Sequence, residues 1–245
     1  KEENEFRLNP EDVEKMITDK TKLIIMNSPQ NPTGAVMTKE EINKIYEIAK
    51  KNDIYLITDE IYSEMIYPEA GSDFYSPSVY DKCRDNVIII GGFSKSHAMS
   101  GWRLGFVVGP EELIHKMSLL IETSVSCVSP FIQRAGIEAI EGDQTAIKNM
   151  IEKYKERRDI LVDGLNSIPK ISCLKPNGAF YVFCNISETG FSDKEFCDYL
   201  LENAGVACAP GTIFGENCKN YVRFCYSSSK EDILEAIEKI RDVLK

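Results

Sequence analysis

Short apolar segments separated by stretches of helix length are the feature that most constrains the fold of this 245-residue chain. Each segment is bounded by turn-forming or polar residues, which is typical of a buried β-strand. Between the first two, Thr38 and Glu41 form a capping-box pattern ahead of a helix that reaches Lys51. Strands joined by helices favour an α/β fold with a mostly parallel sheet. The segments predicted as strands are 22–27, 54–58, 87–90 and 104–108.

The pattern changes in the second half of the chain. Helical periodicity covers 111–126, 130–141 and 144–167, and short strands then alternate with helices as in a small α+β domain. We therefore expect one domain at residues 1–150 and a second at 151–245. The strands predicted for the second domain are 171–174, 179–186, 206–209 and 221–226, and its helices are 193–203 and 230–244.

Charge and composition exclude several classes of function. The chain has 29 Lys and Arg against 39 Asp and Glu, a formal net charge of -10, which disfavours nucleic acid or an anionic membrane as a partner. Its apolar runs are too short to span a bilayer, so we expect a soluble, cytoplasmic protein. Eight cysteines without a C-x-x-C pair predict reduced thiols, and two histidines make a zinc site improbable.

Polar side chains follow three of the predicted strands. Asn31 comes after the first strand, Asp59 and Tyr62 after the second, and Ser94 and Lys95 after the third. In parallel α/β sheets, ligands bind outside the carboxyl ends of the strands, so we expect these side chains to converge on one crevice. A lysine there is costly unless it is paired or neutralised, which favours a functional role.

Four motifs together carry a resemblance to a known family. They are NSPQNPTG at 27–34, DEIY at 59–62, SKSHAMSGWRLG at 94–105 and YVRF at 221–224. In this order and spacing they resemble the pyridoxal-phosphate aminotransferases of fold type I, class I/II. The resemblance implies the later part of the large-domain sheet of that family, mostly parallel with helices on both faces, followed by the small α+β C-terminal domain.

The resemblance implies a role for each matching residue. Lys95 matches the lysine that forms the internal aldimine and then acts as general base, a dual role that suits an amine of lowered pKa. Asp59 matches the carboxylate that pairs with the pyridinium nitrogen and keeps it protonated. Asn31 and Tyr62 match the pair that hydrogen-bonds the phenolic oxygen of the cofactor.

The remaining matches concern anions. Ser94 and Arg103 resemble ligands of the cofactor phosphate, for which a hydroxyl and a guanidinium fork are well suited. Arg223 resembles the residue that clamps the substrate α-carboxylate, with Asn31 beside it. The family builds most of its phosphate site from a glycine-rich turn upstream of the segments seen here. We therefore expect the isolated chain to be inactive and to associate, as a homodimer or a larger assembly.

The implied activity is transfer of an amino group from an amino acid to a 2-oxo acid. A lyase with the same cofactor, of the carbon-sulfur lyase or aminocyclopropane-carboxylate synthase type, remains an alternative. So does an aminotransferase-like effector domain of a transcription regulator. The stretch 116–133 resembles the interface helix and loop of the family but contains no arginine of the kind that dicarboxylate-specific aspartate aminotransferases use across the dimer. The resemblance therefore slightly favours a neutral or aromatic substrate over aspartate.

Overall fold

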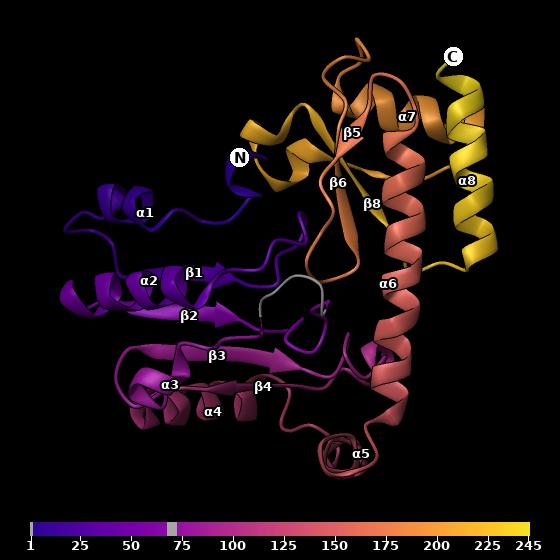
Figure 1. Ribbon diagram of the computed structural model, residues 1–245. Coiled ribbons are helices and arrows are strands. Elements are labelled where there is room, and N and C mark those ends of the chain that lie inside the picture. The colour runs from indigo at the N-terminus through magenta and orange to yellow at the C-terminus, as the bar shows by residue number, and fades with distance from the viewer. Residues whose placement is uncertain (1, 68–72) are drawn as a thin grey trace. The chain divides into compact units, whose positions relative to one another are not determined.

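The computed structural model describes residues 2–67 and 73–245 and divides into two compact units (Figure 1). The N-terminal unit comprises Arg7–Pro29 and Val36–Lys148. The C-terminal unit comprises Asn149–Lys245 together with Gln30–Ala35 and the residues up to Phe6. The chain passes from the N-terminal to the C-terminal unit between Lys148 and Asn149, and two short segments from the start of the chain group with the C-terminal unit.

A mixed four-stranded sheet forms the centre of the N-terminal unit. Its order is β1-β2-β3-β4; β1 to β3 are parallel, whereas β4 is antiparallel to β3. The carboxyl ends of the three parallel strands consequently lie at one edge of the sheet. The strands are β1 (Leu23–Asn27), β2 (Tyr55–Asp59), β3 (Val87–Gly92) and β4 (Gly105–Val108).

Helix α2 (Lys39–Lys51) covers one face of this sheet. Thr38 and Glu41 form the predicted capping box, in which each side chain bonds the backbone of the other. The apolar side of α2 places Ile45 in the same buried cluster as Met26 of β1 and Leu56 of β2. The short helices α1 (Pro10–Met16) and α3 (Ser78–Asp81) were not predicted.

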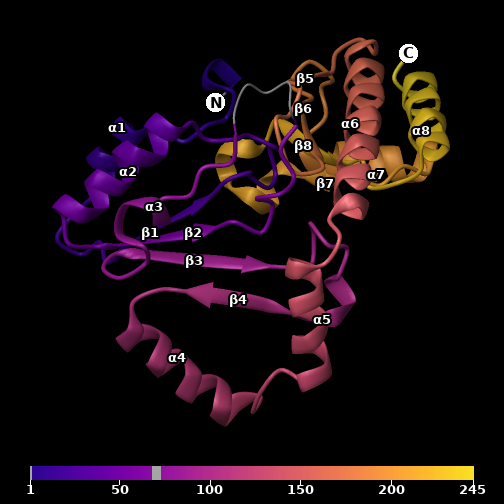
Figure 2. The same cartoon turned by 60° about the horizontal axis from the view of Figure 1, so that its bottom comes forward.

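The other face of the sheet is only partly covered. Figure 2 shows α1 and α2 on one side of the strands and α4 (Glu111–Ser124) on the other. No side chain of α4 is buried, and α5 (Pro130–Glu141) buries only Gly136. Apolar side chains of the strands remain open to solvent on this face, with Ile25 67% exposed. The N-terminal unit thus presents apolar surface that no described residue covers.

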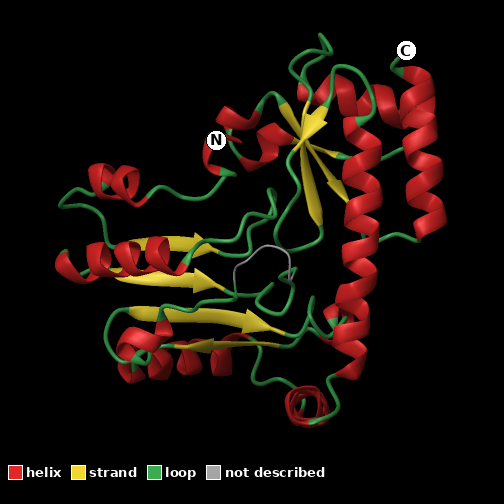
Figure 3. Cartoon of the chain, in the orientation of Figure 1, coloured by secondary structure: helices red, strands yellow, loops and turns green. Residues whose placement is uncertain are grey.

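The C-terminal unit is an antiparallel sheet of order β5-β6-β8-β7 with three helices (Figure 3). Its strands are β5 (Ser172–Cys173), β6 (Tyr181–Asn185), β7 (Ala209–Pro210) and β8 (Tyr221–Cys225). Its helices are α6 (Thr145–Asn166), whose first residues belong to the N-terminal unit, α7 (Asp193–Ala204) and α8 (Lys230–Val243). Short 3-10 helices are η1 (Glu2–Asn4), η3 (Ser100–Trp102), η4 (Gly211–Phe214) and η5 (Glu216–Cys218). Among the described residues no helix is long and apolar enough to cross a bilayer.

Candidate functional site

Asp59 and Lys95 follow neighbouring parallel strands of the N-terminal unit. Asp59 is the last residue of β2 and pairs in register with Ile90 of β3, after which the chain turns at Lys95. The Asp59 carboxylate accepts a hydrogen bond of 3.1 Å from the backbone N–H of Ile61. Asn27 of β1 donates its side-chain amide to the Asp59 carbonyl at 3.0 Å. Asp59 and Lys95 therefore lie at or shortly after the carboxyl ends of neighbouring parallel strands, where ligands bind in α/β sheets.

The turn that carries Lys95 is held by its own backbone. The N–H groups of His97 and Met99 both donate to the carbonyl of Phe93, at 3.3 and 3.2 Å, and that of Ala98 donates to the Lys95 carbonyl at 3.2 Å. Ala98 adopts a left-handed conformation with φ 52°, which is uncommon for a residue with a Cβ. The turn is therefore tightly wound and fixes the Cα of Lys95 close to the end of β3.

His97 anchors the same turn to α5. Its Nε2 lies 3.0 Å from the carbonyl of Ala139, and its Nδ1 lies 2.8 Å from the Ser96 hydroxyl. Because a carbonyl can only accept, Nε2 carries the hydrogen, and Nδ1 accepts from the hydroxyl of Ser96. The sequence reasoning assigned no role to His97.

The remaining predicted residues of this unit differ in exposure. Tyr62 is buried, at 4% exposure, just beyond β2. Arg103 is exposed, and its Nη1 donates 2.9 Å to the carbonyl of Ser100. Ser94 is half-buried directly ahead of Lys95. In the N-terminal unit, Asp59 and Tyr62 thus lie at or after the end of β2, and Ser94, Lys95 and Arg103 lie in the connection from β3 to β4.

Glu60 is a half-buried carboxyl group next to Asp59 to which the sequence motifs assign no role. Burial raises the pKa of Glu60, although hydrogen bonds from Ser76 and Thr58 act in the opposite direction. The Ser76 hydroxyl donates 2.7 Å to its Oε1. The signal in the sequence is its place beside Asp59 at the end of a buried strand.

Arg223 and Asn31 meet in the C-terminal unit. Nη1 of Arg223 donates a hydrogen bond of 2.8 Å to Oδ1 of Asn31. The guanidinium carbon lies 4.4 Å from the ring centroid of Tyr181 and 5.0 Å from that of Phe214. Its Nε is buried and has no hydrogen-bond partner among the described residues. A buried donor without an acceptor is costly, so this geometry favours an anionic ligand.

The turn that carries Asn31 docks on a second turn of the same unit. Within it, Gln30 donates its N–H to the carbonyl of Ala35 at 2.9 Å. The carbonyl of Gly34 accepts the N–H groups of Asn177 and Gly178, at 3.1 and 2.9 Å. A Cβ on Gly34 would stand 2.4 Å from a Pro176 side-chain atom, so a side chain has no room. This contact explains why Gln30–Ala35 groups with the C-terminal unit.

The buried side chain of Arg158, in α6, bonds the turn that contains Pro176. It is 1% exposed, and its Nη1 donates 3.2 Å to the carbonyl of Pro176. Its Nε donates 2.8 Å to the carboxylate of Asp159, which also pairs with Lys175 at 2.9 Å. The sequence reasoning missed Arg158. The available signal was an arginine on the apolar stripe of α6, between Ile151 and Leu165.

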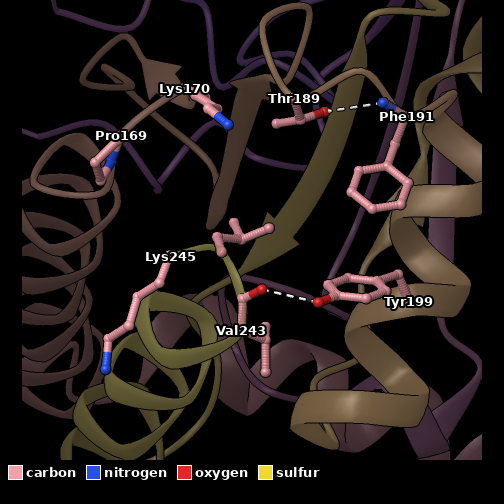
Figure 4. A pocket seen from close by; sticks show the side chains of 8 residues that line it. Pro169, Lys170, Thr189, Phe191, Tyr199, Val243 and Lys245 are labelled. Carbon is pink, nitrogen blue, oxygen red and sulfur yellow. Dashed lines mark hydrogen bonds between the residues drawn. The ribbon is translucent and has the colours of Figure 1, made fainter.

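Two pockets lie wholly within the C-terminal unit. One, of about 810 Å³, is lined by aromatic side chains that include Phe183, Phe214 and Tyr221, and by Gln30 and Pro32 on either side of Asn31. The other, of about 210 Å³, is drawn in Figure 4. It lies by the C-terminal end of α8, and none of the predicted site residues lines it. In the described part of the chain no cluster of His, Cys, Asp and Glu could hold a metal ion.

The predicted residues therefore fall into two sets. Asp59, Tyr62, Ser94, Lys95 and Arg103 belong to the N-terminal unit; Asn31 and Arg223 belong to the other. That Asn31 joins the first set in a single crevice stays a prediction, and so do the individual chemical roles.

A family model described as aminotransferase class I and II matches residues 1–240. The chain belongs to the class I and II aminotransferases. Among curated relatives, an aspartate aminotransferase of Pyrococcus horikoshii is 41% identical over all of this chain and 62% of its own length. An aromatic-amino-acid aminotransferase of Thermococcus litoralis is 38% identical, with the same coverage of both chains.

Solved aminotransferase structures share the fold. An aromatic aminotransferase from Pyrococcus horikoshii superposes with a TM-score of 0.95 at 39% identity, covering all of this chain and 65% of that one. An aspartate aminotransferase from Thermus thermophilus with maleate gives 0.91 at 34% identity, covering 99% and 62%. The chain thus spans less than two thirds of the length of these relatives.

Proposed function

We propose that the chain serves a pyridoxal-phosphate-dependent transfer of an amino group from an amino acid to a 2-oxo acid. The observation that carries this proposal is the placement of Asp59 and Lys95 at the ends of neighbouring parallel strands, together with the family match. Members of the family depend on pyridoxal phosphate, which when bound supplies a reactive aldehyde and an electron-withdrawing ring.

The donor set of the N-terminal unit fits this cofactor. Asp59 offers a carboxylate that holds a proton at the pyridine nitrogen, and Lys95 offers a primary amine for the aldehyde. Tyr62 supplies a hydroxyl for the phenolic oxygen. Ser94 and Arg103 bring a hydroxyl and a guanidinium, the groups that suit a phosphate dianion. Beyond binding, Nζ of Lys95 acts as the base that removes the proton from the substrate Cα.

Arg223 selects the carboxylate of the substrate. Its unpaired, buried Nε and the amide contact with Asn31 support a bidentate grip on an anion. Such a grip fixes the Cα–H bond for proton removal, because two parallel hydrogen bonds define the orientation of the substrate. The Thermus thermophilus relative, whose structure holds the dicarboxylate maleate, supports a carboxylate site in this fold.

We also propose that the chain associates with further protein. Apolar side chains such as Leu23, Ile25 and Phe131 are open to solvent, at 43, 67 and 69% exposure. Apolar surface of this kind is usually covered in a working assembly, and a homodimer is the simplest form. A cytoplasmic location agrees with eight cysteines that are all free thiols.

An amino-acceptor assay tests the function. With pyridoxal phosphate, an amino acid and a 2-oxo acid, we expect the keto acid of the donor to form only when the acceptor is present. The assay is run on this chain, which we expect to be inactive by itself, and on any longer polypeptide that its reading frame encodes, from which we expect the keto acid; aspartate and phenylalanine are the alternative donors. Keto acid and ammonia formed without an acceptor would instead identify a lyase, and Lys95→Ala is the inactive control.

A further inference from the structure

Cys197 and Cys208 form a close pair of thiols in the C-terminal unit. The Sγ of Cys208 lies 3.3 Å from the Sγ of Cys197 and donates its hydrogen to it. A disulfide has sulfurs about 2.05 Å apart, so the two need to approach by only about an ångström. Both cysteines are half-buried, so neither is sealed inside the core.

The local fold creates this pair. Helix α7 ends at Gly205, whose φ of 66° reverses the chain, and the N–H groups of Gly205 and Val206 close the helix on Leu201 and Leu200. The chain then runs back along α7 into β7, and this return places Cys208 beside Cys197.

A second contact holds the returning segment against α7. The carboxylate of Asp193, at the start of α7, accepts hydrogen bonds from the N–H and hydroxyl of Thr212 in η4, at 2.8 and 2.7 Å. The C-terminal cap of α7 and the contact between Asp193 and Thr212 therefore hold the chain in place on both sides of Cys208.

The two thiols differ in reactivity. The hydrogen bond from Cys208 lowers the pKa of Cys197, against burial and the nearby carboxylates of Asp193 and Asp198. The same hydrogen bond and burial raise the pKa of Cys208. Because the thiolate is the nucleophile, Cys197 attacks first and Cys208 resolves.

We propose that Cys197 and Cys208 form a reversible redox pair that a peroxide converts into an intramolecular disulfide. The Cys197 thiolate attacks one oxygen of the peroxide, the O–O bond breaks, and a sulfenic acid forms as hydroxide leaves. Cys208 then attacks this sulfur, an S–S bond forms, and water leaves with the thiol proton. Two thiols lose two electrons, and hydrogen peroxide is reduced to two waters. The step uses none of the residues of the proposed aminotransferase site.

The chain contains its own comparison pair. Cys173 and Cys184 are register partners in the β5–β6 ladder. Burial raises the pKa of Cys173 to about 12 and also raises that of Cys184. These two thiols are therefore close in the fold but poor nucleophiles at neutral pH, so peroxide should leave them reduced.

Peptide mapping of the peroxide-treated chain tests the proposal. The reduced 245-residue chain, kept dilute, is treated with one equivalent of hydrogen peroxide and then alkylated. A glutamate-specific protease then cuts after Glu202, between Cys197 and Cys208, and after Glu216, between Cys208 and Cys218. We expect a linked pair of peptides about 2 Da lighter than their sum, lost on treatment with a dithiol reductant.

Variants identify the partners. Cys197→Ser and Cys208→Ser should each abolish the linked pair, whereas Cys173→Ser should retain it. The proposal is overturned if one equivalent links Cys173 to Cys184, links Cys184 to Cys208, or gives only singly oxidised thiols. Because the unmodified chain supplies the decisive measurement, a variant that fails to fold does not affect the outcome.

Discussion

The guanidinium of Arg223 donates a hydrogen bond of 2.8 Å to the side-chain oxygen of Asn31, although 192 positions separate the two residues. Asn31 thereby uses its only side-chain acceptor atom, while Nε of Arg223 is buried and finds no hydrogen-bond partner in the part of the chain that the structure describes. Because the amide of Asn31 is neutral, this hydrogen bond does not neutralise the positive charge of Arg223, which can still pair with an anionic ligand. Had a carboxylate stood at position 31, the charge would already be balanced.

Two substitutions at Asn31 separate its structural and electrostatic effects. In Asn31→Ala the Nη1 of Arg223 loses its acceptor, and we expect the free energy of unfolding to fall by about 1–3 kcal/mol. Asn31→Asp keeps an acceptor and should lose less stability, but its negative charge competes with any carboxylate ligand. We therefore expect it to weaken binding of a dicarboxylate such as maleate by tenfold or more, since about 1.4 kcal/mol is a factor of ten. Urea denaturation and calorimetric titration measure the two quantities. Equal carboxylate affinity in Asn31→Asp and the unmodified chain would refute an anion site at Arg223.

We expect replacement of the buried Arg158 to lower the free energy of unfolding, although none of the four motifs contains this residue. Replacing it with lysine keeps the charge but removes the planar donors that reach the Pro176 carbonyl and the Asp159 carboxylate. We expect a loss of about 1–3 kcal/mol, because a buried carbonyl is left without its donor. The neighbouring Arg157→Lys is the matched control, since Arg157 is half-buried and rests on the ring of Tyr154 at 6.0 Å. If both variants unfold at the same urea concentration, the inference that Arg158 stabilises the turn at Pro176 is wrong.

Alanine substitutions at Gly34 and Gly205 separate the cost of a left-handed backbone from the cost of steric crowding. Both have positive φ, 69° and 66°, so alanine at either position carries a left-handed cost of about 1–2 kcal/mol. At Gly205 a Cβ meets nothing within 4 Å, whereas at Gly34 it would stand 2.4 Å from Pro176 and 2.8 Å from the carbonyl of Gly178. Gly34→Ala should therefore cost roughly 1–3 kcal/mol more than Gly205→Ala. Similar losses in thermal or urea unfolding would show that the turn at Gly34 moves freely away from Pro176.

Local patterns predict most of the fold of this chain. The capping box at Thr38 and the apolar stripe behind it define α2 to the residue, and Ser192 with Glu195 forms a second capping box at α7. Helix α1 was missed, although Asn9 and Pro10 are typical start signals, because its seven residues are too few for a clear apolar period. The antiparallel β4 could not be foreseen from its sequence, since direction depends on how the short connection after β3 winds.

The candidate site is predictable only where its residues are local in sequence. Lys95, Ser94 and Arg103 share one motif, and Asp59 and Tyr62 share another, so their nearness follows from the chain itself. No local sequence motif predicts the hydrogen bond of Arg158 to Pro176, because it joins a helix to a turn only after the C-terminal unit has packed. The grouping of Gln30–Ala35 with the C-terminal unit is of the same kind.

Glu60 predicts a pH dependence of stability. Burial raises its pKa in the folded chain above the ordinary value of 4.5, so the folded state holds a proton that the unfolded state releases. Stability from this group is therefore present below pH 4.5 and is lost as pH rises through the folded pKa. Glu60→Gln keeps an acceptor for Ser76 but cannot ionise. Its stability relative to the unmodified chain should increase in urea unfolding as the pH rises above 4.5. A difference independent of pH would mean that Glu60 ionises as readily folded as unfolded.

Reductive trapping should single out Lys95 among the lysines. The tight turn that carries Lys95 follows β3, and the neighbouring strand β2 ends at Asp59. In the proposed site, pyridoxal phosphate held by Asp59 therefore presents its aldehyde to one amine, that of Lys95. With substoichiometric cofactor followed by borohydride, we expect the label on Lys95, and Lys95→Ala should lose most of it. Lys116 is the matched comparison, because its exposed amine pairs with Glu112 at 2.7 Å and this pairing raises its pKa.

A more basic amine is less often deprotonated at neutral pH, so Lys116 should react only with excess aldehyde. Asp59→Ala should weaken cofactor retention by about 1.5–3 kcal/mol, the usual strength of a charged hydrogen bond, while Arg223→Ala should leave it unchanged. Trapping on Lys95 in the unmodified chain and in Arg223→Ala, but much less in Asp59→Ala, would agree with the proposed division of roles. Label spread evenly over surface lysines, Lys116 included, would show that this chain has no specific cofactor site around Lys95.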